Sequence, residues 1–87
     1  MIVHIPGPLR SYTGKRSEVQ AAAATLDLLL LGLDREFPGL RFRIVDEQDA
    51  IRPHIKLFVD EEQIHSLGTP LRDASRIHII CALSGGA

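Results

Sequence analysis

The chain of 87 residues contains one cysteine and no excess of charge of either sign. Cys81 alone cannot form an intramolecular disulfide, so the fold must depend on packing and hydrogen bonds, as suits a protein of a reducing cytoplasm. Ten Lys and Arg stand against eleven Asp and Glu, for a formal net charge of −1. Because binding to nucleic acid relies on an excess of cations, this composition argues against a nucleic-acid partner.

Long hydrophobic runs are missing as well. The most apolar stretch, residues 21–33, is interrupted by Thr25 and Asp27 and is shorter than the ~20 residues that span a bilayer. The N-terminus shows no basic leader followed by a long apolar run. We therefore expect no membrane segment and no signal peptide, and we predict a cytoplasmic location.

Hydrophobic residues nevertheless make up 45% of the chain, which is enough for one core. Strands are predicted over residues 2–5, 17–21, 55–59 and 76–83. One helix is predicted after Thr25, a suitable N-cap, and before Pro38-Gly39. Its apolar stripe has the spacing i, i+3, i+4, i+7 and i+11 and consists of Leu26, Leu29, Leu30, Leu33 and Phe37. Residues 40–45 are interpreted as a short extended segment before a solvated turn at 46–49.

One helix and several strands predict an α+β domain over residues 1–83, with a flexible tail of residues 84–87 where side-chain bulk disappears. In the last two strands, alternation places Phe58 and Ile80 on the sheet face opposite the core, with Lys56 and His78 nearby. An exposed apolar spot with a polar rim is typical of a protein interface. A loop folded over this face is the alternative.

Residues that could carry chemistry in the body of the chain show none of the usual motifs. The four histidines, His4, His54, His65 and His78, lack the spacing of a metal site. Cys81 lies between apolar neighbours and is interpreted as a small core residue rather than a nucleophile. The glycines do not form a phosphate-binding loop. We expect no bound metal and no bound cofactor.

Four segments together resemble the MoaD/ThiS family of ubiquitin-like sulfur carriers. They are Ile5-Pro6 followed by Pro8-Leu9-Arg10 and Gly14, the helix end Phe37-Pro38-Gly39-Leu40, the stretch Arg52–Val59, and the terminal Ala82-Leu83-Ser84-Gly85-Gly86. The resemblance covers nearly the whole chain. It implies a β-grasp fold, in which the first and last strands are neighbours in a mixed sheet crossed by the helix.

The resemblance also implies a function located at the chain end. A partner adenylyltransferase of the ubiquitin-activating type would use ATP to adenylate the carboxylate of Gly86. The product would become a thiocarboxylate that gives sulfur to an acceptor enzyme or to the large subunit of a synthase. Gly85, which has no Cβ, would let the tail enter a narrow channel. The chain itself would be a carrier and not an enzyme.

Two positions depart from the family pattern. The chain ends with Ala87 after the second glycine, so we expect a peptidase to remove Ala87 and expose Gly86. Asp60-Glu61-Glu62 stands where the family often has a turn that contains glycine. The sulfur acceptor stays open among molybdopterin, thiazole, cysteine and tRNA thiolation. The alternatives are a ubiquitin-like modifier that forms isopeptide bonds, a noncatalytic interaction domain, and a small subunit of a synthase such as molybdopterin synthase.

Overall fold

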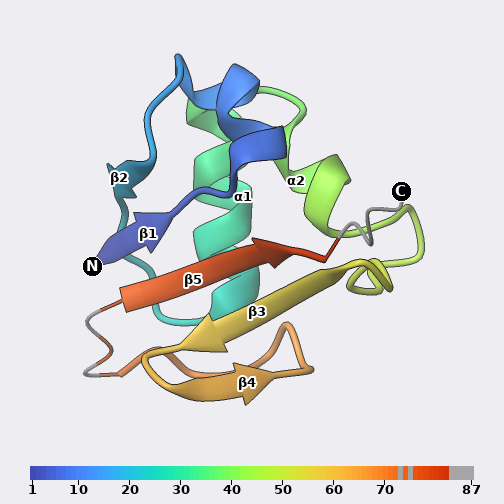
Figure 1. The fold of residues 1–87 in the computed structure, drawn as a ribbon. Coiled ribbons are helices and arrows are strands. Elements are labelled where there is room, and N and C mark those ends of the chain that lie inside the picture. The colour runs from blue at the N-terminus through green and yellow to red at the C-terminus, as the bar shows by residue number, and fades with distance from the viewer. Residues whose placement is uncertain (73, 75, 83–87) are drawn as a thin grey trace.

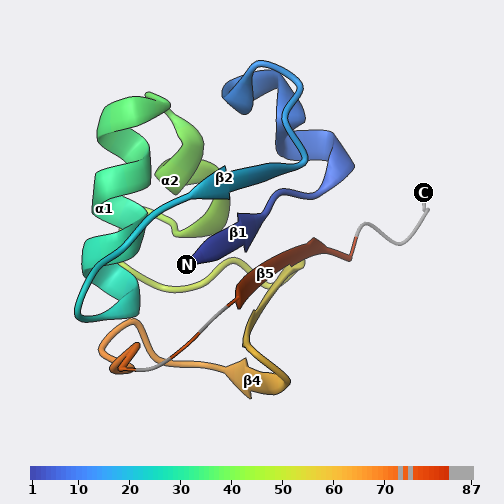
Figure 2. The same ribbon diagram turned by 90° about the vertical axis from the view of Figure 1, so that its left-hand side faces the viewer.

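The computed structural model describes residues 1–72, 74 and 76–82, which form a five-stranded sheet with helices packed on one face (Figures 1 and 2). The elements in chain order are β1 (Ile2–His4), the 3-10 segment η1 (Gly7–Thr13), β2 (Glu18–Gln20), α1 (Leu26–Glu36), α2 (Leu40–Ile44), β3 (Ile55–Val59), β4 (Glu62–Ile64) and β5 (Arg76–Cys81). Among the described residues, no helix is long and apolar enough to cross a membrane.

The strand order in the sheet is β2-β1-β5-β3-β4. The first and last strands pair in parallel, with His4 opposite His78, and the remaining pairs are antiparallel. Figure 1 shows β1 and β5 side by side at the centre of the sheet, with α1 crossing behind them. This mixed sheet crossed by a helix is the β-grasp fold, so the expected fold class is confirmed.

The helix α1 follows its sequence pattern closely. Thr25 is the N-cap, and its side-chain oxygen accepts the N–H of Leu28 at 3.3 Å. The predicted stripe is buried and packs into one core that runs from Val3 in β1 to Ile79 in β5. On the other side of the helix, Leu28 is 52% exposed and therefore lies outside this core.

Residues 40–44 are helical and only Val45 is extended, so the predicted extended segment over residues 40–45 is wrong for all but its last residue. Gly39 has a φ of 93°, which turns the chain sharply after α1, and Leu40–Ile44 then forms α2. The Asp34 carboxylate accepts the N–H groups of Gly39 and Arg41 at 3.1 and 3.2 Å, which satisfies free donors at the start of α2. The buried pair Leu40 and Ile44 is spaced four residues apart, and both side chains therefore reach the core from one helix face.

Other differences lie at the connections. The segment after Pro6 forms η1, which ends where Gly14 adopts a left-handed conformation. Within it, the hydroxyl of buried Thr13 donates to the carbonyl of Arg16 at 2.9 Å. Strand β4 was not predicted, and β5 ends at Cys81 rather than at residue 83. Residues 83–87, including Gly85, Gly86 and Ala87, lie outside the described residues, as does the predicted flexible tail.

Candidate functional site

The four side chains predicted for partner binding lie together on the sheet face opposite the helices. In the β3–β5 register, Lys56 is opposite Ile80 and Phe58 is opposite His78. Directly opposed side chains in such a pair are about 4.5–5.5 Å apart, so the four form one patch, which we call the sheet-face patch. Ile80 is 44% exposed, and Figure 1 shows the helices on the far side of the sheet. No described segment folds over Ile80.

His4 extends the sheet-face patch across β1. Its ring stacks on that of His78, with centroids 4.4 Å apart and an interplanar angle of 3°. Its Nε2 lies 2.9 Å from a guanidinium nitrogen of Arg76, and its Nδ1 lies 3.3 Å from the Glu18 carboxylate. Because arginine only donates, Nε2 must accept, which places the proton of a neutral His4 on Nδ1, facing Glu18. The sequence pattern did not indicate this network, since it depends on the pairing of β1 with β2 and β5.

The remaining candidates, the other histidines and Cys81, do not form a metal site among the described residues. Within the described part of the chain, no set of three or more His, Cys, Asp and Glu side chains could hold a metal ion. Cys81 is half-buried and packs at the edge of the core, opposite Ile55 in β3. The interpretation of Cys81 as a core residue therefore holds in part, because one side of the residue remains accessible.

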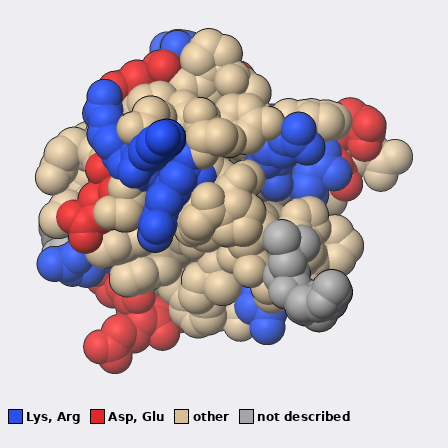
Figure 3. All heavy atoms as spheres, turned by 45° about the horizontal axis from the view of Figure 1, so that its top comes forward, with Lys and Arg blue, Asp and Glu red and all other residues tan. Residues whose placement is uncertain are grey.

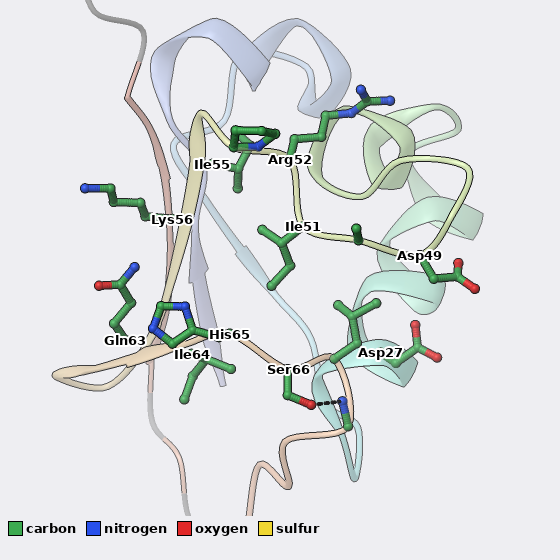
Figure 4. Close-up of a pocket in the computed structure, with 14 residues that line it drawn as sticks. Asp27, Asp49, Ile51, Arg52, Ile55, Lys56, Gln63, Ile64, His65 and Ser66 are labelled. Carbon is green, nitrogen blue, oxygen red and sulfur yellow. Dashed lines mark hydrogen bonds between the residues drawn. The ribbon is translucent and has the colours of Figure 1, made fainter.

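A groove of about 800 Å³ lies on the helix side of the sheet, between β3, β4 and the loop that precedes β3 (Figure 4). Its apolar lining includes Ile51, Ile55, Ile64 and Leu67. At the helix end, Asp27 and Asp49 are both paired with Arg41, at 2.9 and 3.4 Å. The hydrogen bond from Arg41 to Asp27 is the main reason why the pKa of this guanidinium is raised. Both acidic side chains of the groove therefore share one arginine within the chain.

The last described residues place the start of the tail beside the sheet-face patch. Cys81 is opposite Ile55, and the N–H of Ala82 donates to the carbonyl of His54 at 2.7 Å. Gly86 is four residues after Ala82, and a chain of four residues reaches at most about 14 Å. A protein that binds the sheet-face patch therefore lies within reach of Gly86.

Comparisons with known proteins agree with this geometry. The ThiS family profile matches residues 3–86. The sulfur carrier protein CysO of Mycobacterium tuberculosis is 28% identical over 89 residues, covering 97% of this chain and 96% of that protein. A chain of the Amycolatopsis orientalis BexX/CysO complex superposes with a TM-score of 0.89 at 27% identity, covering 98% of each chain. The small archaeal modifier protein 1 of Methanosarcina acetivorans shares the fold, with a TM-score of 0.79 at 23% identity.

Proposed function

This chain belongs to the ThiS family, and from that premise we propose that it delivers sulfur as a thiocarboxylate formed at Gly86. It is a sulfur carrier protein of the CysO/ThiS type and not itself an enzyme. The observation that carries the proposal is the family match, which runs through the second glycine of the terminal pair and stops before Ala87.

The chemistry needs a free carboxylate on Gly86. A carboxylate is a poor electrophile, so one of its oxygens would first attack the α-phosphorus of ATP on a partner enzyme and release pyrophosphate. A sulfur nucleophile would then attack the carbonyl carbon and expel AMP. The resulting thiocarboxylate is an anionic nucleophile that can give its sulfur to an acceptor. In this proposal the folded domain binds the partner enzyme and thereby positions the reacting chain end, and the structure supports such a role for the domain.

The sheet-face patch is the proposed docking surface. Phe58 and Ile80 supply apolar area, while Lys56 and His78 supply the polar rim that protein interfaces usually have. The patch adjoins Ala82, so binding there would order the path of the tail into an active site. Bound in this way, the carboxylate would meet ATP at a high effective concentration.

The proposed chemistry requires the carboxylate of Gly86, so Ala87 must be removed before activation. We propose that a peptidase removes it. Glycine at positions 85 and 86 suits a narrow active site, since a backbone without Cβ atoms occupies the least space.

The decisive experiment compares chains that end at Gly86 and at Ala87. Each is incubated with a purified adenylyltransferase of the ubiquitin-activating type from the same organism, with ATP and a sulfide source, and its intact mass is measured. We expect only the chain that ends at Gly86 to gain AMP and then to exchange one oxygen for sulfur. No change in mass would contradict the proposal, and conjugates that survive boiling and reductant on a gel would favour a protein modifier instead.

A further inference from the structure

A second surface of this chain carries arginine and aromatic side chains that the proposed sulfur chemistry does not use. It consists of Tyr12 in η1, Phe42 and Arg43 in α2, and Arg52 in the loop before β3, and we call it the arginine–aromatic surface. We propose that it docks onto a carboxylate-rich surface of the enzyme that activates the chain end with ATP. This inference rests on the proposed function and adds a second contact to the sheet-face patch.

Both arginines are oriented by contacts within the chain, and both keep hydrogen-bond donors available for a partner. The guanidinium of Arg52 lies 4.5 Å from the ring centroid of Phe42, and its Nε donates to the Phe42 carbonyl at 2.7 Å. The guanidinium of Arg43 lies 5.7 Å from the ring centroid of Tyr12, and its Nε donates to the Tyr12 hydroxyl. Within the described residues, the hydrogen bonds of both groups are made through Nε. The two terminal nitrogens of each group are thus left to bind a carboxylate in a fork.

The exposure of Phe42 supports a protein partner. Its side chain is 52% exposed, although an aromatic ring of this size usually lies in a core. Arginine and aromatic residues are enriched at the centres of protein interfaces. Since ring stacking already restricts both arginines, little side-chain entropy remains to be lost when a partner binds.

The charge of the surface indicates an acidic partner. Among the described residues, neither Arg43 nor Arg52 forms an ion pair. The charge of Arg52 does reach Asp46, where it is a minor cause of the lowered pKa of that carboxyl, after hydrogen bonds from Ala50 and Gln48. In Figure 3, basic side chains form two larger groups separated by uncharged surface, and smaller basic spots lie nearer the edges of the view. A whole chain of net charge −1 therefore presents cations locally.

The position of the surface favours the activating enzyme as its partner. Arg52 is two residues before His54, whose carbonyl accepts the N–H of Ala82, so the surface begins beside the start of the tail. Activation brings an anionic chain end towards ATP, and the two repel each other. Cations next to the tail, attracted to carboxylates on the outside of the enzyme, would offset this repulsion and increase the rate of association.

The test measures binding of the full 87-residue chain to the purified adenylyltransferase loaded with ATP, because docking does not require removal of Ala87. We expect Arg43→Glu and Arg52→Gln each to raise the Kd roughly tenfold or more, as for the loss of a charge-assisted contact. The control Arg72→Glu makes the same charge change in the loop before β5, at the other end of that strand from Ala82, and should change the Kd by less than about twofold.

Melting temperatures of the variants confirm that they fold, and Arg43 is exposed, so Arg43→Glu tests the surface even if Arg52→Gln destabilises the chain. Unchanged affinity of Arg43→Glu would overturn the inference. An equal loss of affinity for Arg72→Glu would overturn it as well. These outcomes concern binding alone, whereas failure of the chain that ends at Gly86 to gain AMP would refute the proposed function itself.

Discussion

Leucines on the two sides of α1 should differ in how much each contributes to the free energy of unfolding. Leu30 is fully buried against the sheet, whereas Leu28 is 52% exposed. We expect Leu30→Ala to lower the free energy of unfolding by about 2–5 kcal/mol, because it leaves a cavity in the core. Leu28→Ala is the matched control and should change stability by less than about 0.5 kcal/mol. Urea denaturation of both variants measures the difference, and equal losses would contradict the assigned core.

Phe58 is the residue by which the sheet-face patch can be tested. It lies between His78 and Gln63 in the sheet, on the face away from the helices. Phe58→Ala should weaken binding to the adenylyltransferase by about 1–3 kcal/mol if the ring is an interface anchor. Gln20 lies on the edge strand β2, and the control variant Gln20→Ala should bind the adenylyltransferase with wild-type affinity. Titration calorimetry gives both values, and wild-type affinity of Phe58→Ala would remove the patch from the proposal.

At the scale of elements, two glycines in neighbouring helical segments should respond to alanine in opposite ways. Gly39 has a φ of 93°, and a Cβ there would lie 3.1 Å from the ring of Tyr12. Gly39→Ala should therefore destabilise the chain by about 1–2 kcal/mol or more. Gly32 lies within α1, where a Cβ meets no atom within 4 Å, so Gly32→Ala should stabilise it by about 0.5–1 kcal/mol. Thermal unfolding compares the melting temperatures of the two variants with that of wild type, and a shift in the same direction for both would contradict this account.

The loop between α2 and β3 should make stability depend on pH. Hydrogen bonds from the N–H groups of Ala50 and Gln48 lower the pKa of Asp46. These bonds favour the ionised form in the folded state, so their contribution is present above the unfolded pKa and is lost as the pH falls through the lower folded pKa. Wild type should exceed Asp46→Asn in urea midpoint at about pH 6, and this advantage should shrink by about pH 3. A constant difference at both pH values would exclude the carboxylate as its cause.

The sequence predicted the long elements better than the short ones. The stripe from Leu26 to Phe37 identified α1, and alternation identified β3 and β5, because these segments contain several consecutive repeats of their pattern. The five residues of α2 contain one buried pair, Leu40 and Ile44, and so few positions do not distinguish a helix from a strand. The expectation that the first and last strands are neighbours came from the family resemblance, since periodicity carries no information on which strands are adjacent, and the structure adds that β1 and β5 pair in parallel.

The candidate sites show the same limit. Alternation alone placed Phe58 and Ile80 on one face, because side chains along a strand point alternately to the core and away from it. The stacking of His4 on His78 joins two distant strands, and that of Arg52 on Phe42 joins a loop to α2, so only the folded chain reveals these contacts. The structure therefore adds the arginine–aromatic surface to a docking face that local patterns had already indicated.

For the whole molecule, body and chain end should be separable by mutation. Among the described residues, all buried core residues lie between Val3 and Ile79. In the chain that ends at position 86, Gly86→Val should abolish adenylation, because a branched side chain blocks a narrow active site, and it should leave the melting temperature unchanged. Mass spectrometry and calorimetry provide the two readouts. Adenylation at the wild-type rate would show that the terminal residue need not be glycine.

The central position of β5 has a consequence for biosynthesis. It joins the β1–β2 hairpin to the β3–β4 hairpin, and it follows the other four described strands in the chain. In a nascent chain the two hairpins therefore cannot join into one sheet until β5 has been translated, and a polypeptide that terminates before β5 cannot assemble the sheet. Truncated chains that lack β5 would thus not form the sheet-face patch, and they would not compete with intact carriers for binding to the same enzymes.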